Sequence, residues 1–366
     1  MPSSWGDTLK LELVGESHGP AVGARLRGLP AGERVDPAAL RALMRRRAPG
    51  RSPLSSARRE EDEVRFLSGL TDGVTDGSEL ILEIRNTDAR PGDYESLRTV
   101  PRPGHADYAA RLKYGAAAPP SGGGAFSGRM TAPLCAAGGV CLQLLRRRGV
   151  EIAAHLLSVG GVEDEAFDPL GPSGEALDRL RAADWPTLDP SRGAEMRAAL
   201  EKAAAAGDSL GGVAECVVTG LPAGLGGPLF EGLEGKLASL LFAIPAVKGV
   251  DFGAGFGAAR LRGSENNDPY SIRDGRIVVE GNRAGGILGG ISTGMPLLFR
   301  AAFKPTPSIA LPQRSVDLAT MTETELRVSG RHDPCVAPRA IPVVEAAAAL
   351  ALLDRMLEEK RWTTEN

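Results

Sequence analysis

The chain has 366 residues, 42% of them hydrophobic and 24% charged, with a formal net charge of -3. That length suits one large domain or two, and the composition is typical of a folded globular protein. Its 47 glycines and 27 prolines are interleaved with apolar segments and show no collagen period, which excludes collagen and disorder. The balanced charge and the 4% aromatic content argue against nucleic-acid binding.

Neither a membrane span nor a disulfide scaffold is expected. No apolar run reaches the ~18 residues that a membrane helix needs, and the first residues, MPSSWGDTLK, lack the pattern of a signal peptide. The four cysteines, Cys135, Cys141, Cys216 and Cys335, form no CxxC pair and no dense framework. We therefore expect reduced thiols and a cytoplasmic location.

Short segments with alternating or β-branched residues between glycines predict strands. These segments are 8–14, 21–27, 63–67, 79–85, 213–219, 247–252, 276–279 and 295–302. Helices are expected at 36–47, 128–148, 193–206, 230–242 and 342–359. Asp36 followed by Pro37 is a typical helix start. The small residues of 128–148 indicate a helix buried on both sides, whereas the pattern of 342–359 predicts an amphipathic helix.

The order of these elements bears on the fold class. Strands come in groups separated by helices, without regular strand–helix alternation. This order predicts an α+β fold rather than a doubly wound parallel sheet. The stretch 161–192 is acidic and interrupted by proline and glycine, so we expect it to be a surface excursion outside the core.

Three of the four histidines lie in short strings rich in glycine, proline or aspartate. They are His18 in GESHG, His105 in RPGHAD and His332 in GRHDPC, whereas His155 lies in an apolar stretch typical of a structural residue. A single loop histidine is more often structural than catalytic. Three in rigid loops favour proton transfer, because imidazole titrates near neutral pH.

Two motif matches are judged to be coincidental. GESHG at 15–19 fits the G-x-S-x-G nucleophile elbow, but that elbow must lead from a strand into a helix, and here a proline and a strand pattern follow. GAGFGA at 253–258 fits a loose dinucleotide fingerprint, yet no long helix pattern follows it.

Cationic residues in glycine- and proline-rich loops predict an anion site. The run 45–47 ends a predicted helix and is partly a solvated face, but Arg129 follows GGG, and Arg331 and Arg339 flank the HDP string. A guanidinium binds phosphate or carboxylate through two parallel hydrogen bonds, and a helix start after GGG offers further N–H donors. The proline-stiffened segment 304–308, KPTPS, fits the same interpretation.

Taken together, these motifs resemble the chorismate synthase family. They follow the family's order from residue 15 to residue 346 and so span nearly the whole chain. The matching strings are GESHG (15–19), RRRAPG (45–50), RPGHADY (102–108), the GGG and S-x-R segment (122–129), GLPAGLGGPLFEGLEGKLASLLFAIPAVKGVDFG (220–253), NRAGGILGGIS (282–292), KPTPSI (304–309) and GRHDPCVAPRAIPVVEA (330–346).

The resemblance implies a fold and an activity. The fold would be a β-α-β sandwich with a helical core, in one domain over 1–366 and assembled as a homotetramer in the cytoplasm. The activity would be the anti-1,4-elimination that converts 5-enolpyruvylshikimate 3-phosphate to chorismate and phosphate, with reduced FMN and no net redox change. An external flavin reductase would supply the reduced FMN, with NADPH only as a source of reducing equivalents. No nucleic acid, membrane or metal is implied.

The resemblance also implies roles for individual residues. His105 would protonate the reduced flavin, and His18 would assist the departure of phosphate. Asp333, acting through Ser17 and Ser127, would handle the proton that flavin N5 passes on. FMN contacts would come from Ala125, Phe126, Ser127, Pro245, Ala246, Gly289, Lys304, Pro305, Thr306, Pro307, Ser308 and Arg331. Substrate or NADPH contacts would come from Arg47, Arg129 and Arg339.

The chain departs from the common family pattern near GGG. Where many members have an arginine, a serine and a glutamate, it has Ala125, Phe126 and Met130, and Pro53 replaces another frequent arginine. Phe126 would pack on the flavin ring in place of the lost polar contacts. Two alternatives remain: a redox flavoenzyme that transfers hydride in the same pocket, and a lapsed paralogue that binds FMN or a metabolite without turnover.

Overall fold

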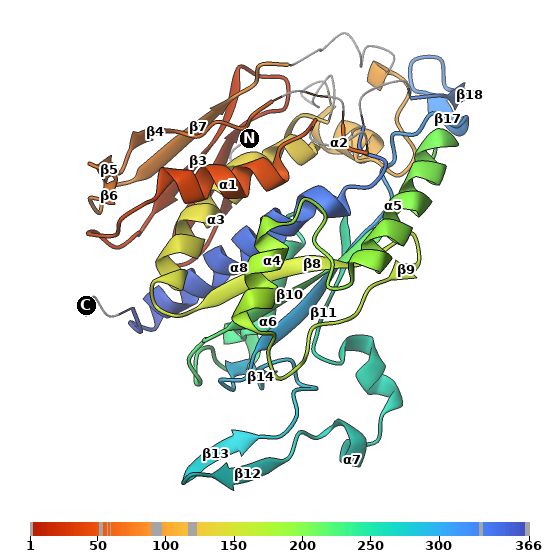
Figure 1. Ribbon diagram of the computed structural model, residues 1–366. Coiled ribbons are helices and arrows are strands. Elements are labelled where there is room, and N and C mark those ends of the chain that lie inside the picture. The colour runs from red at the N-terminus through yellow and green to blue at the C-terminus, as the bar shows by residue number, and fades with distance from the viewer. Residues whose placement is uncertain are drawn as a thin grey trace.

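Two antiparallel sheets enclose a layer of helices in the computed structural model (Figure 1). The structure describes residues 3–50, 54–56, 58, 60–88, 97–115, 123–328 and 332–362. One five-stranded sheet has the order β1-β2-β3-β7-β4 and the other β11-β16-β10-β8-β9. One continuous apolar core joins the helices to both sheets. The α+β sandwich with a helical core is therefore confirmed.

The first sheet buries one face against the helices. In β7 the residues Leu80, Leu82 and Ile84 are buried and alternate with more exposed neighbours, as a half-buried strand requires. The strands of this sheet are β1 Ser3–Trp5, β2 Lys10–Gly15, β3 Ala21–Arg27, β7 Leu80–Arg85 and β4 Arg65–Ser68.

The second sheet is covered on both faces. Leu156 and Cys216 belong to the main core, whereas Val217 belongs to a smaller cluster with Leu177 and Leu180 of helix α4, Gly174–Ala182. The expectation of a surface excursion at 161–192 is therefore wrong in part, because this segment covers the outer face of the sheet. The strands are β11 Val247–Phe252, β16 Leu297–Phe303, β10 Gly212–Thr219, β8 Glu151–Val159 and β9 Val162–Glu163.

The helical layer consists mainly of α1 (Pro37–Arg47), α3 (Thr131–Arg146) and α8 (Ala337–Glu358). Asp36 caps α1 as predicted, since its side chain accepts a hydrogen bond from the Ala38 amide at 2.8 Å. The sequence predicted that the last helix is amphipathic, and this prediction is wrong. Helix α8 lies between two sheets, and every residue of 346–353 is buried. It also begins before Pro342, which lies inside it.

Close approach of α3 to α8 depends on Gly138. A Cβ at this position would lie 2.4 Å from the Ala346 carbonyl oxygen, closer than side chains approach a backbone oxygen. The neighbouring Gly139 makes similar room for Leu40 and Leu43 of α1. The small residues of the predicted buried helix thus set the spacing of all three helices.

The remaining elements are short or peripheral. The β12–β13 hairpin projects away from the two large sheets at one end of the molecule (Figure 1). The four cysteines are free and buried, as expected, and no helix in the described ranges is long and apolar enough to cross a membrane. These elements are β5 Leu70–Thr71, β6 Val74–Thr75, α2 Asp107–Tyr114, η3 Gly124–Phe126, η4 Gly128–Met130, α5 Pro190–Ala205, η5 Leu229–Glu231, α6 Leu233–Leu241, η6 Gly255–Arg260, α7 Gly263–Asn266, β12 Tyr270–Arg273, β13 Arg276–Val279, β14 Ile287–Leu288, β15 Ile291–Ser292, β17 Gln313–Asp317 and β18 Thr322–Leu326.

The packing of α3 on α8 gives a test of stability. Gly138→Ala should lower the free energy of unfolding by ~1–3 kcal/mol, because the backbone of α8 must move to admit the methyl group. Gly235→Ala in α6 is the matched control. Its Cβ would meet no atom within 4 Å, so the better helix propensity of alanine should raise stability by up to ~1 kcal/mol. Urea unfolding of both variants measures the difference, and equal shifts would contradict the packing argument.

Candidate active site

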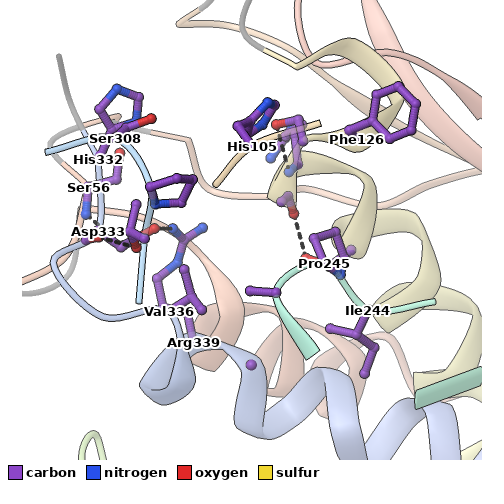
Figure 2. Close-up of a pocket in the computed structure, with 18 of the residues that line it drawn as sticks. Ser56, His105, Phe126, Ile244, Pro245, Ser308, His332, Asp333, Val336 and Arg339 are labelled. Atoms are coloured by element: carbon purple, nitrogen blue, oxygen red, sulfur yellow. Dashed lines mark hydrogen bonds and ion pairs between the residues drawn. The ribbon is translucent and has the colours of Figure 1, made fainter. Parts of the chain in front are cut away.

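A cavity of about 510 Å³ opens where the ends of the three central helices meet. The C-terminal end of α1 and the N-terminal ends of α3 and α8 contribute to its wall, together with loops from both halves of the chain. Figure 2 shows Asp333 and Arg339 on one side of it and Phe126 and Pro245 on the other. Its described lining residues fall within the segments 47–49, 56–60, 102–106, 125–131, 242–246, 304–308 and 332–343, without filling each of them.

A buried carboxylate, Asp62, holds two arginines of the cavity wall together. Its two oxygens accept hydrogen bonds from Arg47 and Arg129, one each. Arg129 Nη1 also lies 3.1 Å from Glu60 Oε2, and Arg47 Nε donates to Thr131 Oγ1 at 3.2 Å. Burial alone would raise the pKa of Asp62, but the two guanidinium charges outweigh it and hold that pKa below its usual value. The carboxylate therefore stays ionised and fixes both arginines.

Arg339 and Asp333 form a second pair at the start of α8. Arg339 Nη1 donates to Asp333 Oδ2 at 2.5 Å, and Arg339 Nε donates to the Arg47 carbonyl at 2.9 Å. The other Asp333 oxygen accepts from the Ser56 amide at 2.8 Å, and the Thr306 hydroxyl donates to the Asp333 carbonyl at 2.7 Å. Asp333 is thus tied to three parts of the chain that line the cavity.

His105 is oriented by a carboxylate and an arginine. Its Nδ1 lies 2.5 Å from Asp107 Oδ1, and Arg102 holds Asp107 through Nε at 2.7 Å and Nη2 at 2.9 Å. Burial would raise the pKa of Asp107, but hydrogen bonds and charges from Arg102 and His105 place it well below the usual value. Gly123 leaves room for the imidazole, since a Cβ there would lie 3.2 Å from the ring. Gly123 therefore makes room for a histidine and also precedes the short helix η3.

The GESHG loop lies beside the cavity without forming part of its lining. Ser17 is buried and His18 half-buried, and neither belongs to the lining residues. The loop is connected to the site by hydrogen bonds: Arg58 Nη2 donates to the Ser17 carbonyl at 3.4 Å, and Asn86 bridges the loop to Arg129. No hydrogen bond joins Asp333 to Ser17 or to Ser127 in the described part of the chain; Ser127 Oγ instead accepts from the Arg129 amide at 3.2 Å.

The structure places some of the residues predicted to contact FMN at the cavity and others away from it. Most line the cavity: Ala125, Phe126, Ser127, Pro245, Ala246, Lys304, Thr306, Pro307 and Ser308. Gly289 does not, because it lies in the turn between β14 and β15 at the other end of α6. Pro305 is exposed and outside the lining, and Arg331 falls outside the described residues.

Positive charge exceeds negative charge at the cavity wall. Among the described lining residues are six cationic side chains, of Arg47, Arg58, Arg102, Arg129, Lys304 and Arg339, against the carboxylates of Glu60 and Asp333. Burial together with the charges of Lys248 and Arg102 lowers the pKa of Lys304. Burial and the neighbouring Arg47 also lower the pKa of Arg339, against the opposing effect of Asp333. Such crowding of cations favours an anionic ligand.

Sequence inspection missed the acidic residues and the amide that hold the site together. Glu60 and Asp62 follow the basic pair 58–59 and are two positions apart from each other. On an extended chain, this spacing places both carboxylates on one face. Asp107 is inside the RPGHAD string but escaped notice beside His105. Asn86 had no signal in the sequence. Its role depends on hydrogen bonds to Gly19 and Glu16, which lie 67 and 70 positions away in the sequence.

These features define an enzyme site for an anionic small molecule, and comparison with known proteins identifies the family. The chorismate synthase family model matches residues 9–357. Chorismate synthases of Lancefieldella parvula and Thermococcus gammatolerans are 45% and 47% identical, over 100% and 98% of this chain and 98% of each relative. A crystal structure of a chorismate synthase matches with a TM-score of 0.75 at 27% identity, covering 97% of this chain and 93% of that one. The chain belongs to the chorismate synthase family.

Family membership gives the reaction. The protein is a lyase that converts 5-enolpyruvylshikimate 3-phosphate to chorismate and phosphate, the last step of the shikimate pathway that feeds aromatic amino-acid biosynthesis. Its substrate is a small molecule, and the family requires a flavin. The expected activity is thereby confirmed, and the geometry of the cavity can be interpreted in terms of a substrate with one phosphate and two carboxylates.

The Asp62 ion pairs predict a pH-dependent loss of stability. Asp62→Asn should lower the free energy of unfolding at pH 7 by ~3–5 kcal/mol, because it leaves two buried guanidinium groups without their shared anion. The folded-state pKa of Asp62 is lowered, so its contribution is complete above the unfolded value of 3.8 and is lost as the pH falls below that value. The difference between wild type and variant should therefore shrink below about pH 4.

Asp72→Asn is the control for this measurement. Asp72 is exposed and has a φ of 50°, close to the 54° of Asp62, so both replacements meet the same backbone conformation. Urea unfolding from pH 7 down to pH 3 should show little change for Asp72→Asn. A loss for Asp62→Asn that stays constant over this range would contradict the ion-pair account.

Proposed function

We propose that the cavity binds reduced FMN and the phosphorylated substrate together and that its cationic wall carries the departure of phosphate. The single observation behind this is the excess of cationic over anionic side chains among the described residues that line one cavity, next to an oriented histidine and an apolar surface. The catalytic domain is the whole chain, an assignment supported by the continuous core beneath both sheets.

The donor set and the surface of the cavity fit FMN. Ile244, Pro245, Ala246 and Val343 offer an apolar surface suited to a flat ring system. Beside this surface, where the Lys304 N–H donates to the Ala246 carbonyl at 2.9 Å, the segment 304–308 supplies an ammonium and two hydroxyls suited to the FMN phosphate. When bound, reduced FMN supplies the reducing group that the elimination needs without being consumed overall.

The reaction removes a phosphate from one carbon of the substrate and a proton from another. Arg47 and Arg129 face the cavity in fixed positions, since Asp62 holds both. Arg339 lies next to them through its bond to the Arg47 carbonyl. Their charges would stabilise the negative charge that develops on the leaving phosphate, without reorganisation at the moment of reaction. His18 would donate a proton to the same group.

His105 and Asp333 would manage the remaining protons. The carboxylate of Asp107 fixes the tautomer and orientation of the His105 ring, so that the imidazole can hold a proton toward the flavin site. Asp333 would handle the proton that the flavin passes on, with Ser17 and Ser127 as relay groups. The buried Ser17 hydroxyl has no hydrogen-bond partner among the described residues, which leaves it available to a bound ligand or water.

Phe126 would cover one side of the flavin. The ring lines the cavity, is 37% exposed and lies 6.5 Å from the ring of Tyr114, centroid to centroid, so Tyr114 supports it from outside the lining. Ala125 next to it contributes no charge where the family commonly has arginine. The nearby Arg102 and Lys304 would compensate for that lost charge.

The assembly and its supply of flavin complete the proposal. The protein would act as a cytoplasmic homotetramer, and an external flavin reductase would provide reduced FMN, with NADPH as the source of electrons. Strongly exposed apolar side chains on peripheral elements support burial between subunits. Among the described residues they include Leu229, Phe230, Phe256, Ile272 and Ile277.

An anaerobic assay tests the proposal. With dithionite-reduced FMN and 5-enolpyruvylshikimate 3-phosphate, many molecules of chorismate should form for each FMN, and the flavin should remain reduced. With oxidised FMN, no chorismate should form. Oxidation of one flavin for each product would indicate a redox flavoenzyme, and FMN binding without turnover would indicate a lapsed paralogue. Chorismate absorbance and flavin absorbance measured together separate these outcomes.

A further inference from the structure

We infer that Asn86 is a positioning residue that fixes the His18 loop to the arginine wall of the cavity. This inference rests on the proposed function, in which His18 serves the leaving phosphate. His18 does not line the cavity itself, so something must hold its loop in place relative to the groups that do. Asn86, the residue that follows β7, makes this connection through its side-chain amide.

The amide of Asn86 closes the loop at both ends. Its Nδ2 donates to the Glu16 carbonyl at 3.1 Å and to the Gly19 carbonyl at 2.8 Å. Its backbone N–H donates to the Pro20 carbonyl at 3.0 Å. Ser17 and His18 are the two residues between the carbonyls that the amide bridges. Asn86 therefore fixes the part of the chain that carries the proposed acid.

The same amide also holds the cavity wall. Asn86 Oδ1 accepts from Arg129 Nε at 2.8 Å, and the carbonyl of Arg85 accepts from Arg129 Nη2 at 3.1 Å. Arg129 shares Asp62 with Arg47. One side chain thus links the His18 loop to the two arginines that would receive the phosphate. A displacement of about 1 Å between such groups can cost roughly 100-fold in rate.

Asn86→Asp separates the two functions of the amide. The carboxylate keeps an oxygen for Arg129 but loses both donors and sets an anion against two carbonyls. We expect kcat to fall by roughly 10–100-fold while the KM for the substrate changes little. Amide hydrogen exchange should also become faster at Gly19, whose N–H closes the turn onto the Glu16 carbonyl at 3.1 Å.

Asn282→Asp is the matched control. Asn282 has the same pattern of bonds, with Nδ2 donating to the carbonyls of Pro169 and Pro296 and Oδ1 accepting from the Gly286 amide, and it does not line the cavity. It should lower stability about as much as Asn86→Asp, with kcat within about threefold of wild type and unchanged exchange at Gly19.

A double-mutant cycle with His18→Ala provides the decisive test. If Asn86 acts through His18, Asn86→Asp should change kcat by less than about threefold in the His18→Ala background. An equal fall in both backgrounds, or an effect on KM alone, would overturn the inference and leave the role of His18 intact. If His18→Ala itself leaves kcat unchanged, the proposed role of His18 fails, and the inference fails with it. Asn86→Ser, which removes the two N–H donors and the Oδ1 acceptor without adding charge, replaces Asn86→Asp in the cycle should the latter not fold.

Discussion

The close packing of α3 against α8 is the constraint on which the rest of the structure depends. Gly138 allows the two helices to approach, and Gly139 allows α1 to join them. This layer is buried by one sheet on each side, which is why every residue of 346–353 in α8 is buried. Because the three helices are fixed together, the end of α1 and the starts of α3 and α8 converge, and the cavity forms at that point.

At this junction, cationic side chains line the cavity and carboxylates lie behind them. The arginines of the wall are backed by buried or partly buried carboxylates: Asp62 behind Arg47 and Arg129, and Asp107 behind Arg102 and His105. Each carboxylate orients its cations without neutralising the cavity, which keeps more cations than anions along its lining. An arrangement of this kind stabilises a leaving phosphate through fixed charges and avoids the cost of rearranging water. The Asn86 amide extends the same frame to the His18 loop.

Sequence patterns predicted the elements well where local chemistry decides them. Asp36 and Pro37 start a helix because their side chains suit its first turn, and the 21–27 strand follows from its residues alone. The excursion at 161–192 was misjudged because α4 is too short and too polar to look like core. The apolar side of α4 is buried because Leu177 and Leu180 pack on the outer face of the second sheet, which they cover.

The site shows the same division between local and long-range information. The histidines and arginines could be found from motifs, since their loops are rich in glycine and proline. The residues that hold them could not, because Asp62 and Asn86 matter only through partners that the fold brings together. Gly289 illustrates the converse: its motif is part of the resemblance, but a single chain does not bring it to the cavity.

The central claim is that one cavity, walled by arginines on a carboxylate frame, receives the substrate phosphate. A crystal structure of the protein with FMN and 5-enolpyruvylshikimate 3-phosphate tests this most directly. The account predicts that the substrate phosphate lies within hydrogen-bond distance of the guanidinium groups of Arg47, Arg129 and Arg339, with the Asp62 ion pairs intact. A phosphate bound elsewhere, with these three arginines making no contact with it, would contradict the account.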